Sequence, residues 1–277
     1  MRAIGIEYIS VFGLPPVEFV NLAADLGCAH IGTALVPMPH NPHGYPPWSL
    51  VQDRALRREV IAAMRDRGVS ISLGEGFFVR PNSDIRDRAA DLDIMCELGV
   101  KHINTLSIDP DRTRSFDQFA VLAEMTAALG VQTVVEFGPP LAVADLPTAL
   151  AAIRHVRQPN CRLLIDTMHL VRSGSSAADI AALDRDTIGY IQLCDAPLVS
   201  RFSEYAEEAK FERLPPGTGE LPLLDILAAL PPDLPIGLEV PQRSQAEAGV
   251  GPRERLGRCV EAALNLLRRL EPPEPPP

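Results

Sequence analysis

The sequence predicts a single (β/α)₈ barrel of the TIM type, and three observations lead to this fold class. Short apolar, β-branched runs alternate with longer amphipathic stretches along 277 residues, and such barrels commonly take about 250 residues as one domain. The runs are nearly continuous in hydrophobicity, which is typical of parallel strands buried on both faces. Helix-to-strand junctions repeatedly carry glycine. We expect the barrel to span residues 1–270, and the proline-rich tail 271–277 to be disordered.

Eight strands, each followed by a helix, is the count that closes a parallel barrel. The predicted strands are Ile4–Ile9, His30–Leu35, Val69–Gly74, His102–Ile108, Val131–Phe137, Cys161–Asp166, Ile188–Asp195 and Ile236–Val240. The predicted helices lie near 15–27, 53–67, 84–98, 116–129, 145–156, 176–183, 222–230 and 253–269, with a further short helix near 202–210.

The junction glycines support this repeating unit, because a glycine that closes a helix just before a strand is the usual turn chemistry. They are Gly27, Gly68, Gly99 and Gly130. The competing fold, an open doubly wound sheet, more often has a glycine-rich phosphate loop after its first strand. The segment 10–15, Ser-Val-Phe-Gly-Leu-Pro, contains no such loop.

Composition restricts the partners. The 26 Lys and Arg residues face 36 Asp and Glu residues, a net charge of −10, which disfavours nucleic acid and anionic membrane surfaces. No apolar run approaches the roughly 20 residues that span a bilayer, and the start lacks a signal-peptide pattern. The five scattered cysteines form no zinc-binding spacing, so free thiols are expected. We therefore expect a cytoplasmic protein, and leave open whether it forms a homo-oligomer.

Two connections after predicted strands are unusually long, 36–49 and 196–221. Both fall at the end of the barrel where such folds place their chemistry. The first carries five prolines with His40, His43 and Trp48, which we expect either to form a wall of a substrate pocket or to belong to a rigid lid. Glu75, at the end of the third predicted strand, faces the same mouth and is expected to contact substrate.

The fifth to eighth predicted strands each end in a side chain that can bind a metal ion: Glu136, Asp166, Gln192 and Glu239. Because the ends of neighbouring barrel strands meet at one mouth, these side chains should converge on one point. Three carboxylates and an amide oxygen suit Mg²⁺ or Mn²⁺, and the carboxylates would repel one another without a cation. The alternative is that each acts separately, as a helix N-cap or surface ion-pair partner. The presence of four such side chains on consecutive strands favours a metal site.

The order of motifs resembles the xylose isomerase-like barrel superfamily, which includes sugar isomerases and epimerases, inosose and 3-dehydroshikimate dehydratases, and an AP endonuclease branch. Three segments carry the resemblance: Asp166-Thr167-Met168-His169, Gln192-Leu193-Cys194-Asp195-Ala196-Pro197, and the 213–220 loop Arg-Leu-Pro-Pro-Gly-Thr-Gly-Glu. The resemblance implies that Glu136, Asp166, Gln192 and Glu239 hold one divalent ion. It further implies that Glu136 and Glu239 exchange protons, while His169 and Arg213 bind substrate oxygens, with His169 also a candidate proton shuttle.

Gln192 departs from most epimerases of the superfamily, which have histidine there, and is more like the dehydroshikimate dehydratases. Against that side, only Arg80 and Arg213 are available near strand ends for a substrate carboxylate. The AP endonuclease branch needs further metal-binding histidines, and only His169 falls in a matching motif.

The resulting prediction is a divalent-metal-dependent isomerase or epimerase that removes a proton next to a metal-bound carbonyl of a small polyhydroxylated hydroxy-ketone. Mn²⁺ or Mg²⁺ is the expected ion, with Co²⁺ and Zn²⁺ left open. A metal-dependent dehydratase is the alternative, since loss of a leaving group after the same first step gives elimination. A non-catalytic sugar- or polyol-binding barrel is a third reading, which four metal-competent residues disfavour.

Overall fold

The structure, a computed structural model, describes residues 2–270 and confirms the predicted fold class. Eight parallel strands pair in chain order, and β8 pairs with β1 to close the barrel. The strands are β1 (Ile4–Ile6), β2 (His30–Thr33), β3 (Ser70–Gly74), β4 (His102–Thr105), β5 (Gln132–Val135), β6 (Cys161–Asp166), β7 (Ile188–Leu193) and β8 (Ile236–Leu238). The predicted tail 271–277 lies outside the described residues.

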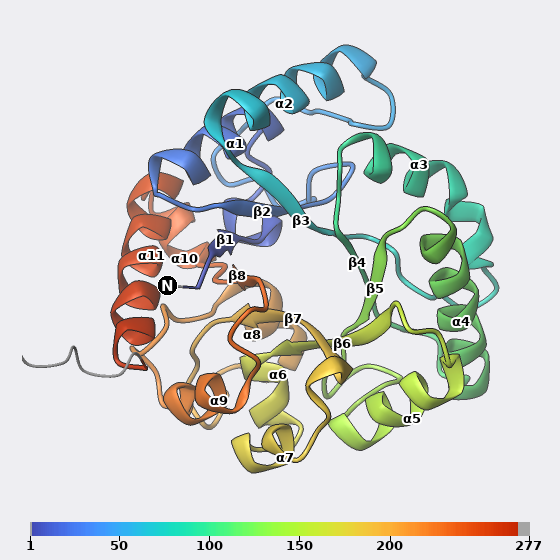
Figure 1. Ribbon diagram of the computed structural model, residues 1–277. Coiled ribbons are helices and arrows are strands. Elements are labelled where there is room, and N and C mark those ends of the chain that lie inside the picture. Colours follow the sequence, from blue (N-terminus) through green and yellow to red (C-terminus); the bar gives the residue numbers. More distant parts are fainter. Residues whose placement is uncertain (1, 271–277) are drawn as a thin grey trace, which may run out of the picture.

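Helices form an outer ring around these strands (Figure 1). The main ones are α1 (Pro16–Asp25), α2 (Arg54–Arg67), α3 (Ala89–Glu97), α4 (Arg112–Ala128), α5 (Leu146–Val156), α7 (Ala177–Ala181), α9 (Leu223–Ala229) and α11 (Pro252–Arg268). Shorter helices lie between them: α6 (Thr167–Arg172), α8 (Tyr205–Phe211), α10 (Arg243–Glu247), and the 3₁₀ turns η1 (Tyr8–Val11), η2 (Ile85–Arg88) and η3 (Arg185–Thr187).

Several strands end earlier than predicted, and the residues beyond them turn across the mouth of the barrel. The predicted first strand reached Ile9, but β1 ends at Ile6 and the chain enters the 3₁₀ turn η1. The predicted fourth strand reached Ile108, whereas β4 ends at Thr105. The apolar side chains in these segments made the predicted strands too long. They face the mouth or pack above the barrel, although their backbone is not part of the sheet.

Aspartate caps begin four of the helices that follow the strands, and glycines stand at the ends of four, α1 to α4. Aspartate carboxylates accept the backbone N–H three residues on at α2, α4, α5 and α6, from Asp53, Asp111, Asp145 and Asp166. The four predicted junction glycines all have positive φ, from 66° at Gly68 to 78° at Gly99. These signals explain why the sequence alone located the βα repeats.

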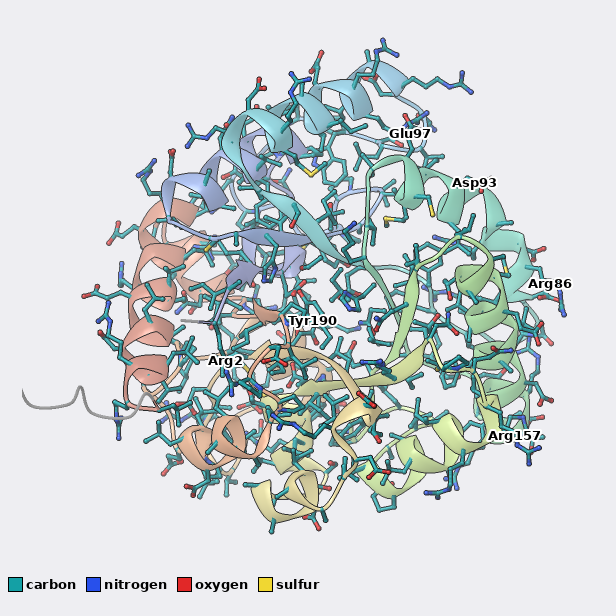
Figure 2. All side chains as sticks on the ribbon, viewed as in Figure 1. Arg2, Arg86, Asp93, Glu97, Arg157 and Tyr190 are labelled. Carbon is teal, nitrogen blue, oxygen red and sulfur yellow. The ribbon has the colours of Figure 1, made fainter. Side chains whose placement is uncertain are left out.

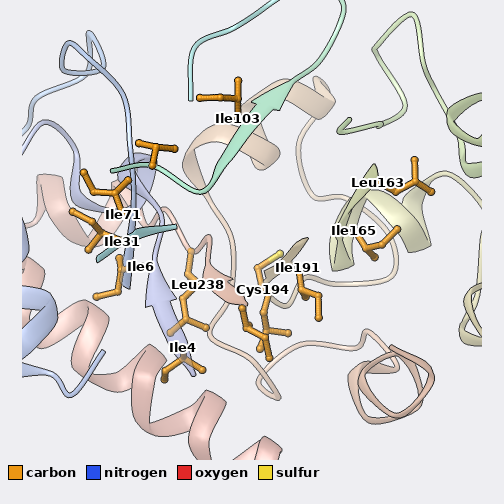
Figure 3. Packing of buried hydrophobic residues seen from close by; sticks show 14 of the residues in the cluster. Ile4, Ile6, Ile31, Ile71, Ile103, Leu163, Ile165, Ile191, Cys194 and Leu238 are labelled. Atoms are coloured by element: carbon orange, nitrogen blue, oxygen red, sulfur yellow. The ribbon is translucent and has the colours of Figure 1, made fainter. Parts of the chain in front are cut away.

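Apolar side chains fill two separate layers. The larger cluster lies between strands and helices; Figure 3 shows its strand side chains, among them Ile6, Ile31, Ile165 and Leu238. The smaller cluster fills the interior of the barrel with Leu73, Val134, Leu164 and Tyr190. Tyr190 lies near the middle of the ring of strands, whereas labelled side chains such as Arg86 and Arg157 lie at its periphery (Figure 2).

Alternation along the strands carries this inner layer up to the mouth. Side chains two residues apart on a strand share a face. Glu136 follows the interior residue Val134 by two positions, Asp166 likewise follows Leu164, and Gln192 follows Tyr190. Asp166 and Gln192 are also direct partners in the β6–β7 register. The fold therefore aims the polar strand-end residues at the space above the barrel core.

No helix within residues 2–270 is long and apolar enough to cross a membrane.

Candidate active site

A cavity of about 590 Å³ opens at the carboxyl end of the barrel. Its floor is polar and is formed by strand-end side chains together with two residues from the adjoining helices and loops: Glu75, Glu136, His169, Arg213 and Glu239. Its walls come from the segments that follow the strands, including η1, residues 36–52 between β2 and α2 (called the 36–52 connection below), and α8. This is the end of a βα barrel at which enzymes of this fold place their active sites.

Arg213 is the central cation of the floor and is 2% exposed. Its guanidinium bridges two carboxylates: Nη1 donates to Asp166 Oδ2, and Nη2 lies 2.9 Å from Glu239 Oε2. Its Nε donates to the Ala209 carbonyl at 2.7 Å. Arg213 is thus fixed by three groups from β6, β8 and α8, and it holds two of the predicted metal ligands in place.

Two buried amides link the remaining carboxylates. Asn104 Nδ2 donates to Glu136 Oε2 at 2.6 Å and to Glu75 Oε2 at 3.1 Å. Gln192 Nε2 donates to Glu239 Oε1 at 3.0 Å and lies 3.4 Å from Glu75 Oε1. The amide oxygens of Asn104 and Gln192 are both buried and find no hydrogen-bond partner within residues 2–270. Such unpaired oxygens are costly unless a ligand or ion satisfies them.

His169 connects the floor to helix α8. Its Nδ1 is hydrogen-bonded to the Tyr205 hydroxyl, and its Nε2 lies 3.3 Å from Glu136 Oε1. Its backbone N–H donates to Asp166 Oδ1 at 2.9 Å, so Asp166 caps α6 at the same time as it pairs with Arg213. The capping role and the site role proposed from sequence for Asp166 are therefore compatible.

The carboxyl groups of the floor have pKa values that are shifted in opposite directions. Burial raises the pKa of Glu75 well above its ordinary value, and neighbouring Glu136 adds to the effect. Burial also raises the pKa of Glu239, and Arg213 only partly offsets this. For Asp166, burial is outweighed by Arg213 and His169, and its pKa falls to about 2. One guanidinium cannot neutralise both of its partners, and Asp166 takes the larger share of its charge.

The loop that carries Arg213 is held by Asp195, at the end of the strand-seven motif. Asp195 Oδ2 accepts the N–H groups of Gly217 and Gly219, both at 2.9 Å, and Oδ1 accepts that of Leu221 at 3.1 Å. The backbones of Asp195 and Leu214 also form an antiparallel bridge. Asp195 thereby ties the 213–221 loop to β7 and positions the guanidinium.

Comparison with known proteins identifies the family. The sequence matches the family model described as "Xylose isomerase-like TIM barrel" over residues 20–265. The chain belongs to this family. No curated protein matches the chain.

Solved structures agree in fold at low sequence identity. The IOLI protein with a bound zinc atom has a TM-score of 0.80 and 16% identity, covering 97% of this chain and 99% of that one. The probable 3-DHS dehydratase AsbF from Bacillus anthracis has a TM-score of 0.74 and 16% identity, covering 96% and 99%. A D-psicose 3-epimerase from Clostridium cellulolyticum H10 has a TM-score of 0.68 and 17% identity, covering 97% and 99%.

A longer relative contains the same fold as one part. A xylose isomerase-like TIM barrel/4-hydroxyphenylpyruvate dioxygenase fusion protein has a TM-score of 0.72 and 20% identity. The match covers 99% of this chain but 45% of that one.

One structure of similar fold contains a bound zinc atom, so we asked whether the residues of this site suit a metal ion. Within residues 2–270, no group of three or more His, Cys, Asp or Glu side chains is already arranged to hold one. Arg213 lies against Asp166 and Glu239, and the Gln192 amide nitrogen faces the carboxylates. Reversing that amide would turn its unpaired Oε1 towards Glu239. Hard oxygen donors in excess of positive charge then fit a divalent cation.

The predicted site residues divide into two groups. Glu75, Glu136, His169, Arg213 and Glu239 line the cavity, as does His40 from the 36–52 connection. Asp166 and Gln192 lie directly beside this floor through Arg213 and Glu239.

His43 and Trp48 do not line the cavity. Trp48 Nε1 donates to the Gly13 carbonyl at 3.0 Å, which ties the connection to the segment after η1. The ring centroid of His43 lies 5.5 Å from that of Tyr45 in the same connection. Arg80 lies over the Phe78 ring, at 5.3 Å from its centroid, and does not line the cavity either.

Sequence reasoning missed Asn104 and Tyr205. Asn104 is an inward side chain on β4 between Ile103 and Thr105. It lay inside the predicted strand 102–108, so the argument from strand ends did not select it. Tyr205 belongs to the long connection after β7, where no local pattern indicates that its hydroxyl meets His169.

Proposed function

We propose that the protein is a divalent-metal-dependent isomerase or epimerase of a small, carbohydrate-like hydroxy-ketone. The observation that carries this proposal is the floor of the cavity. Three buried carboxylates, Glu75, Glu136 and Glu239, share it with one guanidinium and with two amides whose oxygens are unpaired. Such a floor suits a cation and an oxygen-rich ligand better than it suits an apolar ligand end.

Glu136, Asp166, Gln192 and Glu239 are the residues that would hold the ion. A divalent ion supplies Lewis-acid polarisation of a carbonyl, which acidifies the adjacent C–H. Asp166 is held by Arg213 and by the first turn of α6, so its role is to stay ionised and fixed. Arg213 keeps Asp166 and Glu239 apart at a set spacing and limits their mutual repulsion.

Glu136 and Glu239 are the candidate proton acceptors, because both line the cavity and they follow the ends of two different strands, β5 and β8. Two carboxylates reaching a substrate from different directions allow one to remove a proton and the other to return it. His169 holds one edge of Glu136 through Nε2 and is itself oriented by Tyr205. Because Nδ1 is engaged with Tyr205, only Nε2 can reach the substrate, and it would donate to a substrate oxygen in place of its contact with Glu136.

A metal-dependent dehydratase is the second candidate, and Gln192 is the observation that favours it. Gln192 is an amide at the position where most epimerases of the resembling superfamily have histidine. One structure of similar fold is that of a probable 3-DHS dehydratase. The first proton removal would be shared by both reactions. Departure of a hydroxyl group in place of reprotonation would then give elimination.

The decisive experiment is a panel of ketoses, inososes and dehydroshikimate incubated with protein and Mn²⁺ in D₂O and followed by NMR. The proposal expects deuterium at the carbon next to the carbonyl, formation of an isomer or epimer, and loss of both after EDTA treatment. Loss of water with a new C=C signal would establish the dehydratase instead. Exchange that survives complete metal removal would contradict the metal requirement, and binding without exchange across the panel would favour a non-catalytic barrel.

A further inference from the structure

The walls of the cavity differ in chemistry from its floor. Above the carboxylates, apolar side chains from five different connections line much of the space, beside the polar groups of Tyr8, His40, Tyr205 and Lys210. The apolar side chains include Ile9, Met38, Phe78, Leu106, Ile108 and Phe211. A small polyol bound in such a space would leave some of its outer hydroxyl groups against surfaces that cannot form hydrogen bonds with them.

Ile108 gives a second, independent indication. Its side chain is 46% exposed, although it is a large aliphatic residue at the rim of the cavity. The chain around it is fixed: its N–H donates to the Val79 carbonyl at 3.0 Å, and its neighbours Ser107 and Asp109 are buried. Exposed apolar side chains that are held in place around a concave site commonly mark a surface that a ligand covers.

In the outer part of the cavity, beyond the ion that the proposed function places on the floor, few positive charges are available to an anionic group. Among its lining residues in the described chain, the only Lys and Arg side chains are Lys210 and Arg213. Arg213 already donates to Asp166, Glu239 and the Ala209 carbonyl. Lys210 is exposed, and the same cavity is lined by the carboxylates of Glu75, Glu136 and Glu239.

The size of the cavity fits more than a small sugar. At about 590 Å³ it lies within the range of sites that enclose a drug-sized ligand. A hydroxy-ketone group on the floor would occupy only the inner part. The remaining volume is bordered by apolar side chains, among them Phe78, Ile108 and Phe211, which suit an apolar group of the substrate.

We propose that the substrate is an uncharged molecule with an oxygen-rich end on the carboxylate floor and a ring-sized apolar group between the walls. The inference rests on the proposed function for the chemistry of the polar end. It adds an apolar group to the hydroxy-ketone end of that substrate.

Three probes that share one hydroxyacetyl group test this inference. They are hydroxyacetone, 2-hydroxyacetophenone and 4-(hydroxyacetyl)benzoate, which carry a methyl, a phenyl and a carboxyphenyl group. Calorimetric titration of the Mn²⁺-loaded protein should find the phenyl probe bound roughly tenfold or more tightly than the methyl probe, because the ring buries additional apolar area. The carboxyphenyl probe should bind several-fold more weakly than the phenyl probe.

Equal affinities for methyl and phenyl probes would overturn the apolar subsite. Tighter binding of the carboxyphenyl probe would overturn the requirement for an uncharged substrate. Deuterium exchange at the hydroxymethyl carbon, measured on the same samples, reports on the proposed function separately. Exchange without a phenyl preference refutes only the inference, whereas a phenyl preference without exchange refutes only the reaction.

Matched variants locate the subsite. Ile108→Asn should reduce the preference for phenyl over methyl several-fold, because it places an amide on the wall. Val51→Asn is the control, since Val51 is 43% exposed, similar to Ile108 at 46%, but does not line the cavity. Both side chains are partly in solvent, so both variants should keep the melting temperature of the parent. A phenyl preference that Ile108→Asn leaves unchanged would refute the assignment to this wall.

Discussion

The floor of the cavity and the barrel interior beneath it contain the same kinds of side chain but differ in organisation. Both layers contain buried polar atoms without a hydrogen-bond partner in residues 2–270: the Asn104 and Gln192 amide oxygens at the floor, and Glu7 Oε2 and His30 Nε2 beneath it. The difference is that the floor carboxylates face open space. Beneath the floor, Tyr190 donates to Glu7 Oε1 at 2.8 Å, and Ser72 Oγ lies 2.7 Å from both Tyr190 Oη and His30 Nδ1. None of these four residues lines the cavity.

Glu7 shows how tightly the lower layer is enclosed. A Cβ added to Gly32 would lie 1.6 Å from Glu7 Oε2, and one added to Gly237 would lie 1.6 Å from Oε1. The carboxyl group therefore fits only because both flanking strands have glycine there. Burial raises its pKa to about 8, and the Tyr190 hydrogen bond offsets only part of this.

The contrast shows that burial and altered acidity do not by themselves identify a functional carboxyl group. Glu7 and Glu239 are both buried, and both have a raised pKa. Only Glu239 also borders a cavity and shares a cation with another carboxylate. Access to space for a ligand distinguishes the two layers, and the following predictions test that distinction.

The largest effect is expected for Glu239→Gln. The amide keeps the shape and an oxygen, but loses the charge and the ability to accept a proton, so kcat should fall by about 10³-fold or more. Glu7→Gln is the matched control and should retain activity within about tenfold. Rates measured on the substrate found by the NMR panel provide the check. Near-normal turnover of Glu239→Gln would show that Glu239 has no acid–base role. The floor and the lower layer would then not differ in function as proposed.

A change of metal preference is expected for Gln192→His. Imidazole is a softer donor than an amide oxygen, so affinity for Co²⁺ or Zn²⁺ relative to Mg²⁺ should rise roughly tenfold or more. Calorimetric titration of metal-free wild type and variant measures both affinities. If the order and ratio of affinities stay fixed, Gln192 is not a ligand, and the main reason for considering a dehydratase is lost.

A smaller effect is expected for Tyr205→Phe, which removes the hydrogen bond to His169 Nδ1. Loss of one such bond should lower kcat by about tenfold while KM changes little, because the ring of His169 loses its orientation and the cavity keeps its walls. Tyr45→Phe is the control, since Tyr45 does not line the cavity. A rise in KM with unchanged kcat would instead assign Tyr205 to substrate binding.

The smallest effect concerns stability and belongs to the lower layer. Because the pKa of Glu7 is about 8 in the folded protein and near 4.5 otherwise, the folded state holds a proton that the unfolded chain releases. This contribution is complete below the ordinary carboxyl range and is lost as pH rises towards 8, with a slope of up to about 1.4 kcal/mol per pH unit.

Urea unfolding between pH 5 and pH 8 measures this slope. Glu7→Gln should flatten the dependence relative to wild type, whereas Glu124→Gln, at an exposed carboxyl group on α4, should not. An unchanged slope in Glu7→Gln would show that Glu7 is ionised in the folded protein, and that the lower layer is less enclosed than its contacts indicate.

Local signals in the sequence determined the barrel and much of its mouth. Hydrophobic runs, Asp caps and junction glycines act over a few residues, so they are readable without the fold. The polar ends of β5 to β8 were readable for the same reason, since alternation along a strand places Glu136 and Glu239 on the inner face.

Tertiary structure alone decided which of these groups meet and what surrounds them. Arg213 lies 47 positions from Asp166 in the chain, and only closure of the barrel brings its guanidinium between Asp166 and Glu239. Tyr205 reaches His169, and the apolar walls assemble from separate connections, for the same reason. No local preference encodes such contacts, because they depend on how distant segments pack around one cavity.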